Sequence, residues 1–300
     1  MTEEGKMTES RAFHNKPLKS SGMWLDVWRQ VRRNRAAVAG IIILGILIFV
    51  AIAAPLLAPH DPNEMNLRDA LKAPGTPGHI LGTDELGRDI LSRLIFGSRV
   101  SLTVGLIVVG IAGTIGVVLG AISGYYGGLA DMIIMRTVDL LLAFPFLVLA
   151  IAVVSIVGAS LTNMMIVLGA VSWISYARLV RGLVLSLREE EFVVADRVVG
   201  VRTWKVLLRH ILRYTLGVVV VQATFGVAMA ILAATALSFL GVGAQPPTAA
   251  WGAMLSTAKK NMRQHPMLAF APGFAIMITV LAINFVGDAL RDALDPRLRI

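Results

Sequence analysis

The chain has 300 residues, of which 56% are hydrophobic and only 16% are charged. An ordinary soluble domain has about 25% charged residues, so this chain lacks the polar surface that a soluble protein of its size would need. Its formal net charge is +9, which in a soluble protein would suggest nucleic acid binding. In a membrane protein, basic loops hold the cytoplasmic side in place, so no nucleic acid partner is expected. The absence of cysteine excludes disulfides and thiolate metal sites.

Six apolar stretches of roughly 20 residues follow one another, and each is long enough to cross ~30 Å of hydrocarbon. A polar tail and a short helix rich in Trp and Arg precede the first stretch, and we expect this helix to lie on the cytoplasmic membrane face. The sequence therefore predicts an all-α membrane protein with six transmembrane helices. The predicted spans are residues 36–58, 100–122, 133–157, 164–180, 212–240 and 267–290.

Basic residues set the predicted orientation. They gather in the N-terminal tail, in the loop between the fourth and fifth spans, and at the C-terminus. A six-span path that begins in the cytoplasm puts all three groups on that side, where Lys and Arg are enriched in membrane proteins. The loop at 241–266, which carries Lys259, Lys260 and Arg263, is the exception. We therefore expect both termini in the cytoplasm.

The loop between the fourth and fifth spans contains a predicted helix. Ser186 and Glu189 fit a capping box, in which the hydroxyl accepts an early backbone N–H and the carboxylate reaches back. Glu189, Glu190 and Glu191 then fall in the first turn, where the helix dipole favours negative charge. Gly200 is placed to end the helix in the left-handed conformation. These signals predict a cytoplasmic helix between Ser186 and Gly200.

One face of this helix is apolar, because Phe192, Ala195 and Val199 recur with the 3.6-residue period. A second segment at 203–211 leads directly into the fifth span, so the loop could carry movement of a soluble partner into the bilayer. The pattern fits an ordinary basic interfacial loop equally well. Both interpretations stay open on the pattern alone.

A charged segment, HILGTDELGRDILSR at 79–93, follows the first span. Thr83 can cap a helix whose first turn holds Asp84 and Glu85. From Leu86 onward an apolar stripe lies opposite a charged face, which predicts an amphipathic helix at the outer membrane face. Its role is either purely structural or contact with another protein. The residues singled out are Gly82, Thr83, Asp84, Gly87, Arg88 and Asp89.

Two residues interrupt the third predicted span. Asp139 lies one turn from Arg136, so an ion pair near the cytoplasmic end is favoured over a substrate ligand. Pro145 removes a backbone hydrogen bond and should kink the helix, which would either open a cavity or aid packing. Uncharged polar residues in later spans either line or gate a pathway or hydrogen-bond between helices. They are Gln222, Thr224 and Asn284.

Several stretches resemble one family of transport proteins. EFVVADRVVG at 191–200, with RHIL at 209–212, resembles the "EAA" loop of bacterial ABC importer permeases, although only Ala195 of the Glu-Ala-Ala triplet agrees. The segment at 79–93 is similar to the signature of the C-type permease subunit of dipeptide, oligopeptide and nickel importers. Three further stretches resemble the same subunit: DLLLAFP at 139–145, LSFLGVGAQPP at 237–247 and GDALRDALDPR at 287–297.

The resemblance implies a type I ABC importer permease fold with a cytoplasmic coupling helix, in a bacterial or archaeal cytoplasmic (inner) membrane. It implies a heterodimer with a second permease, two ATPase subunits that bind ATP and Mg²⁺, and an extracytoplasmic solute-binding protein. The solute would be a peptide or a similar small solute, such as glutathione or a nickel chelate. The residues implied in ATPase coupling are Ser186, Glu189, Glu190, Glu191, Phe192, Ala195, Asp196, Val199 and Gly200.

On this interpretation the chain has four parts. Residues 1–35 form the cytoplasmic tail and interfacial helix, and residues 36–98 form the first span and an extracytoplasmic segment. Residues 99–290 form the five-helix permease domain with its coupling loop at 178–213. Residues 291–300 form a cytoplasmic C-terminus.

The sequence predicts no covalent chemistry and no cofactor in this chain. The motif GxxxxGK[ST], which cradles ATP phosphates, does not occur. The five histidines, at positions 14, 60, 79, 210 and 265, have no ligand spacing, so no metal site is expected. Two rival interpretations remain: a self-sufficient secondary transporter or channel, which would need buried charges in its spans, and a membrane anchor or sensor that transports nothing.

Overall fold

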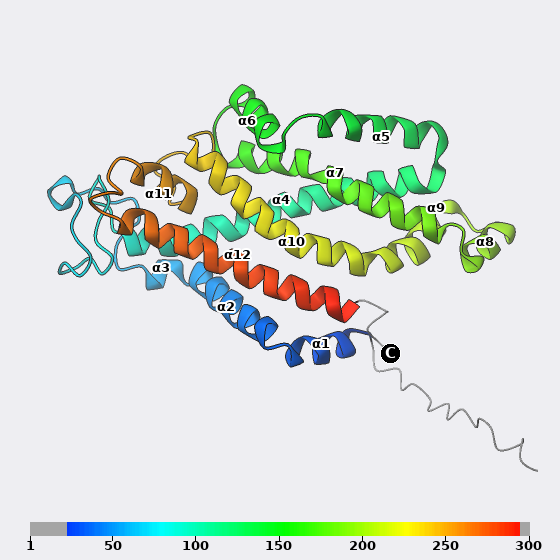
Figure 1. Ribbon diagram of the computed structural model, residues 1–300, viewed down its shortest axis with the longest axis horizontal. Coiled ribbons are helices and arrows are strands. Elements are labelled where there is room, and N and C mark those ends of the chain that lie inside the picture. Colours follow the sequence, from blue (N-terminus) through cyan, green and yellow to red (C-terminus); the bar gives the residue numbers. More distant parts are fainter. Residues whose placement is uncertain (1–22, 295–300) are drawn as a thin grey trace, which may run out of the picture.

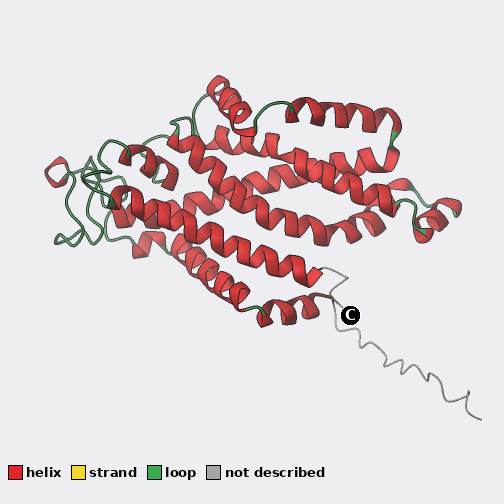
Figure 2. Ribbon diagram, viewed as in Figure 1, coloured by secondary structure: helices red, strands yellow, loops and turns green. Residues whose placement is uncertain are grey.

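The computed structural model describes residues 23–294, which form helices joined by loops (Figures 1 and 2). The predictions for the tail before residue 23 and for residues 295–300 lie outside this range. The elements in chain order are α1 (Met23–Arg33), α2 (Arg35–Ile52), α3 (Ala54–Leu57), η1 (Leu67–Asp69), α4 (Ile90–Tyr126), α5 (Gly128–Leu142), α6 (Phe146–Val157), α7 (Leu161–Leu187), α8 (Glu191–Val198), α9 (Thr203–Val206), η2 (Leu207–Ile211), α10 (Leu212–Phe239), α11 (Trp251–Ala258) and α12 (Met267–Leu294).

Five helices of the described range are long and apolar enough to cross a membrane. They are α2, α4, α7, the continuous stretch Thr203–Phe239, and α12. The pair α5 and α6 makes a sixth span if it is counted as one. Hydrophobic length thus predicted the spans, but α7 covers Leu161–Leu187 and is longer than the predicted fourth span.

The third predicted span is not one straight helix. α5 ends at Leu142, α6 begins at Phe146, and the two helices meet at an angle of 93°. Pro145 lies at the break, where it precedes the first residue of α6. The break agrees with the predicted kink, because proline cannot donate the backbone hydrogen bond that would continue α5.

The helices run between two ends of the bundle (Figure 1). We call the end that carries α8 the α8 end, and the end that carries residues 59–89 and α11 the loop end. α1 and the end of α12 both lie toward the α8 end, where Gln30 Nε2 donates to the backbone oxygen of Asp292 at 3.4 Å. Both ends of the described chain therefore lie on the same side of the bundle. The short helix α11, which the sequence did not predict, lies at the loop end.

Local capping explains where two of the spans begin. Asn34 Oδ1 accepts hydrogen bonds from the backbone N–H groups of Ala36 and Ala37 at the start of α2, at 3.0 and 3.3 Å. Ser160 Oγ accepts from the backbone of Asn163 at the start of α7, at 3.1 Å. Both residue types satisfy the unpaired N–H groups of a first turn.

A row of glycines lets α4 and α7 pack in direct backbone contact. Gly116, Gly120 and Gly124 recur every fourth residue on one face of α4 and are buried. A Cβ atom on Gly120 would lie 2.5 Å from the carbonyl oxygen of Ala177, and one on Gly124 would lie 2.8 Å from the Cβ of Val184. Small residues at this spacing allow close approach of membrane helices, where van der Waals packing rather than the hydrophobic effect drives association.

Two glycines of α10, Gly217 and Gly226, differ in how closely they pack. Gly226 packs closely, because an added Cβ would collide with the hydroxyl of Tyr176 on α7. Gly217 has only the methyl groups of Leu294 near it, at 3.7 and 3.8 Å. Close packing therefore accounts for Gly226 and not for Gly217.

Candidate functional site

The helix in the loop between α7 and α10 begins later than the sequence predicts, at Glu191 rather than Ser186. α7 continues through Ser186 to Leu187, so Ser186 lies in the last turn of α7 and caps nothing. The loop helix α8 begins at Glu191 and is eight residues long. Glu190 is its N-cap residue and makes no side-chain capping bond. Glu189 instead accepts a hydrogen bond from the Nε of Arg188 at 2.8 Å. The backbone hydrogen bonds of α7 thus override the local capping signal.

The end of α8 is as predicted. Gly200 has φ +82°, the left-handed conformation that favours glycine. Its backbone N–H donates to the Arg197 carbonyl at 3.0 Å, and that of Val201 donates to the Asp196 carbonyl at 2.9 Å. This is the Schellman arrangement, which satisfies carbonyl groups at the end of a helix.

α8 is anchored to the membrane helices through one buried side chain. Val193 is fully buried against Val180 and Val184 of α7 and against Val206 and Ile211 of the segment that leads into α10. The buried residue is therefore Val193 rather than the predicted face of Phe192, Ala195 and Val199. Val193 therefore links α8 to the end of α7 and to the segment that leads into α10.

Aromatic and polar contacts reinforce this anchor. The ring of Phe192 stacks on Tyr214 of α10 with centroids 5.5 Å apart. Asp196 Oδ2 lies 2.9 Å from Nε2 of His210 in η2. The guanidinium group of Arg197 lies 4.9 Å from the ring centroid of Tyr125 at the end of α4. α8 thus contacts α4, α7 and α10 within a few residues.

The outer side of α8 and the segment after it present apolar side chains to solvent. Val198 and Val199 are 82% and 81% exposed. Val194, Trp204 and Leu208 are also exposed in the same segment. We call these five side chains the α8 surface. Ala195 and Glu191 are exposed on the same helix. Exposed apolar groups gathered in this way mark a surface that contacts another protein or a membrane.

A charge pair near the α8 end links three helices, and the sequence analysis missed it. Arg181 of α7 makes a bidentate ion pair with Asp131 of α5. Its Nε donates to Oδ1 at 2.5 Å and its Nη2 donates to Oδ2 at 2.7 Å. Ser123 of α4 donates to the same carboxylate. The predicted pair of Asp139 with Arg136 is wrong, since both side chains are exposed and no ion pair joins them in the described range. Asp131 pairs with a residue that is distant in the sequence, whereas Arg136 is close to Asp139 in the sequence without pairing with it.

A cavity of about 760 Å³ lies among α4, α5, α6, α7 and α10. Apolar side chains line most of it. Its polar lining residues are Ser172, Ser175, Tyr176, Arg178 and Gln222. Leu142 and Phe146, which flank the break at Pro145, also line it.

The other predicted pathway residues lie outside this cavity. Thr224 lines a separate apolar crevice of about 480 Å³ among α2, α4, α10 and α12. Its hydroxyl donates within α10 to the Val221 carbonyl at 2.6 Å. Asn284 is half-buried on α12, and Asp139 is exposed on α5. Of the five candidates, geometry places only Gln222 and the break at Pro145 at the cavity.

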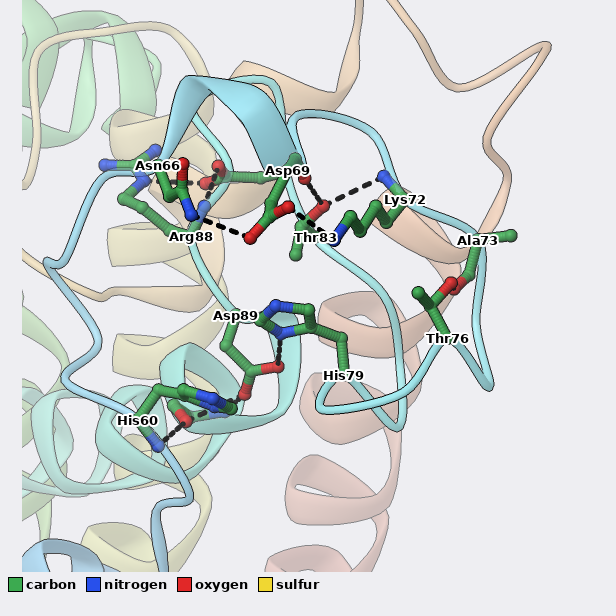
Figure 3. Close-up of polar contacts among 12 residues, drawn as sticks. His60, Asn66, Asp69, Lys72, Ala73, Thr76, His79, Thr83, Arg88 and Asp89 are labelled. Carbon is green, nitrogen blue, oxygen red and sulfur yellow. Dashed lines mark hydrogen bonds and ion pairs between the residues drawn. The ribbon is translucent and has the colours of Figure 1, made fainter.

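At the loop end, the segment predicted as an interfacial helix is mostly an ordered loop. Asp89, not Thr83, caps the helix, and α4 begins at Ile90. Asp89 Oδ2 accepts from the backbone and the hydroxyl of Ser92 at 2.8 and 2.7 Å. Thr83 holds the loop instead, accepting from the Lys72 backbone at 2.9 Å. Figure 3 shows Thr83 beside Asp69 and Lys72.

Four charged residues of this segment, Asp84, Arg88, Asp89 and Arg93, are buried rather than solvated. Arg88 is only 2% exposed, and its Nε donates to Asp84 Oδ2 at 2.7 Å. The other oxygen of Asp84 accepts from the backbone N–H groups of Leu86 and Arg88 at 2.9 and 3.0 Å. A hydrogen bond from Lys72 lowers the pKa of the nearby Asp69 carboxyl. An unpaired buried charge would be costly, so these partners are what allow the segment to fold inward.

Gly82 and Gly87 have positive φ angles of +81° and +74° and touch neighbouring backbone. We expect Gly87→Ala to destabilise the loop end, because its Cβ would collide with the Asn66 carbonyl oxygen, and overpacking of this kind costs about 1–3 kcal/mol. Gly78→Ala is the matched control, with φ +88° and open space around it. The melting temperature of the purified protein should fall further for Gly87→Ala. Equal losses would show that backbone strain alone matters there.

Comparison with known proteins decides the family. The profile of the family described as "binding-protein-dependent transport system inner membrane component" matches residues 116–300, and that of the "N-terminal TM domain of oligopeptide transport permease C" matches residues 22–74. The chain belongs to this family of inner-membrane permeases.

The permease is similar over nearly its whole length to curated relatives. It is 45% identical to the dipeptide transport system permease protein DppC of Alkalihalophilus pseudofirmus, covering 92% of this chain and 90% of the relative. It is 44% identical to the glutathione transport system permease protein GsiD of Pectobacterium atrosepticum, covering 92% of both chains. It is 42% identical to the oligopeptide transport system permease protein OppC of Haemophilus influenzae, covering 94% of this chain and 91% of the relative.

The permease is therefore a multi-pass subunit of an ABC importer and not an enzyme, because ATP hydrolysis in this family belongs to a separate subunit. This excludes the two rival interpretations, a self-sufficient transporter and a non-transporting anchor. As a member of this family, the permease works in a membrane together with a partner permease and ATPase subunits. The "EAA" loop and its coupling helix are features of the family.

Proposed function

We propose that this permease forms half of the pathway by which peptides, or a similar small solute such as glutathione or a nickel chelate, enter the cell. The names of its relatives, which cover dipeptide, oligopeptide and glutathione permeases, support this solute range. The cavity of about 760 Å³ is the candidate half-pathway. Gln222, Tyr176 and Arg178 would supply its polar contacts to the solute.

The observation that carries the proposal is the α8 surface. α8 projects beyond the membrane helices with Val198 and Val199 exposed, while Val193 locks its other side to α7 and α10 (Figure 1). A groove on an ATPase subunit would cover this apolar surface. ATP and Mg²⁺ would be bound by that subunit, and its movement would be transmitted through Val193 and the contacts of Phe192 and Asp196. Alternating access then follows from the tilting of α7 and α10.

The same assignment sets the orientation and the other partners. With α8 docked on an ATPase, the α8 end and both chain termini lie in the cytoplasm. The loop end then faces outward, where exposed Leu67 and Ile80 are available to a solute-binding protein. A second, different permease would complete the cavity, so that the assembly is a heterodimer of permeases with two ATPase subunits.

A single introduced cysteine tests the docking of α8, because the chain has no cysteine of its own. We expect Val198→Cys, labelled with a maleimide-benzophenone and irradiated in the assembled complex, to form a crosslink with an ATPase subunit, because the photoactivated group inserts into any nearby C–H bond. Met65→Cys is the matched control, since Met65 is 54% exposed at the loop end. An ATPase crosslink from Met65→Cys but not from Val198→Cys would reverse the proposed orientation. No crosslink from either would remove the assignment of the α8 surface.

A further inference from the structure

Three potential metal ligands meet at the loop end although they are scattered in the sequence. His60 follows α3, His79 lies in the loop before α4, and Asp89 caps α4 (Figure 3). One ligand atom from each residue lies within 4.8 Å of the other two. His79 Nδ1 and Asp89 Oδ1 are 3.0 Å apart. The sequence argument against a metal site considers linear spacing alone, whereas the fold of the loop brings these three residues together.

The state of His60 points to a missing partner. Its Nδ1 atom is buried and has no hydrogen-bond partner. No other buried side-chain nitrogen or oxygen in the described part of the chain lacks one. Its ring stacks on that of His79 with centroids 4.8 Å apart and an angle of 30° between the planes. Buried polar groups normally have a partner, so an orphaned imidazole nitrogen beside a second imidazole and a carboxylate needs an explanation.

The carboxylate is already held in place for a ligand role. Asp89 Oδ2 accepts both hydrogen bonds from Ser92, which leaves Oδ1 turned toward His79. The Ser92 hydroxyl also accepts a hydrogen bond from the backbone N–H of His60 at 3.0 Å. Ser92 thus ties two of the three residues together. Outer contacts of this kind orient the ligands of metal sites.

We propose that His60, His79 and Asp89 bind one divalent transition-metal ion of the zinc class. Two imidazoles and a carboxylate are a ligand set that zinc accepts, with water in the fourth position. Ions that prefer oxygen ligands, such as Mg²⁺ and Ca²⁺, do not suit a site with two nitrogen donors. Neighbouring ligand atoms around a tetrahedral zinc ion with bonds of ~2.0–2.1 Å are about 3.3 Å apart, so the outermost pair must close by about 1.5 Å.

The bound ion would join two separate segments of the loop end. His60 lies on the segment that leaves α3, whereas Asp89 is the N-cap residue of α4. A metal that binds the folded loop and not the unfolded chain stabilises the fold in proportion to its occupancy. The proposed site is independent of the solute pathway, because none of its residues lines the cavity among α4, α5, α6, α7 and α10.

Zinc binding by the purified full-length chain tests the site directly. The protein should carry an affinity tag without histidine, be incubated with Zn²⁺ and dialysed, and its zinc content measured by mass spectrometry. We expect close to one tightly held ion per chain and a melting temperature that rises with Zn²⁺ but not with Mg²⁺ or Ca²⁺. His60→Gln should weaken binding at least about tenfold, since losing even an outer contact costs 10–100-fold.

The variants are chosen so that misfolding cannot imitate the result. His60→Gln removes an imidazole that makes no side-chain hydrogen bond, so it should fold without zinc as the wild type does. His265→Gln is the matched control, a half-buried histidine at the loop end outside the cluster. Wild-type binding well below one ion per chain would overturn the proposal. Equal affinity in wild type and His60→Gln would overturn it as well.

Discussion

Replacing Val198 and Val199 together by aspartate should separate this permease from its ATPase subunits while leaving its own fold intact. Both side chains are more than 80% exposed, so the change costs the isolated chain little. In the complex, two unpaired carboxylates would be buried against the partner, and buried unpaired charges are strongly unfavourable. We expect at least about tenfold weaker association, which corresponds to 1.4 kcal/mol. Co-purification of the ATPase subunits measures it.

The control for this pair is Met65→Asp, which puts one aspartate on an exposed apolar residue at the loop end. It should leave ATPase co-purification unchanged. The melting temperature of the isolated Val198→Asp, Val199→Asp chain should match the wild type. Normal ATPase association by the double variant would rule out the α8 surface as the docking site.

Replacing Gly120 by valine should have the largest effect on folding. A Cβ at this position would lie 2.5 Å from the Ala177 carbonyl oxygen and 3.0 Å from the Cβ of Val180, so α4 and α7 would have to separate. Overpacking in a rigid core costs about 1–3 kcal/mol, and here the obstruction is backbone that cannot turn away. We expect a large loss of monodisperse protein in detergent and a lower melting temperature for the remainder.

Gly110→Val on the same helix is the matched control. Gly110 has open space where a Cβ would be placed, and it is exposed in the chain. It carries the same change in helix propensity, so the difference between the two variants isolates the contact with α7. If both variants fold equally well, the glycine row does not determine how α4 and α7 pack.

Properties that depend on neighbouring residues in the sequence were predictable. The apolar length of a span is local, so five of the six predicted spans correspond to continuous helices of the described range. Pro145 marked the break in the remaining one, and Gly200 marked the end of α8. The glycine row at Gly116, Gly120 and Gly124 also has a local signal, its spacing of four residues.

Properties that depend on distant residues were not predictable. Ser186 has a good capping sequence around it, but α7 simply continues past it. The charged segment before α4 was assigned to the surface because charges usually are, whereas Arg88 is buried against Asp84. The pairing of Asp131 with Arg181 joins α5 to α7. Each of these outcomes depends on which helices become neighbours, and the arrangement of the helices cannot be derived from local patterns in a single sequence.

Uptake by the reconstituted complex tests the central claim most directly. Liposomes should contain this permease, its partner permease and the ATPase subunits, with the solute-binding protein and a labelled dipeptide outside and ATP within. We predict uptake that requires ATP and both permeases and that is lost with Val198→Asp, Val199→Asp. Solute uptake at the same rate by this chain alone, without ATPase subunits or ATP, would contradict its assignment as a coupled half-permease.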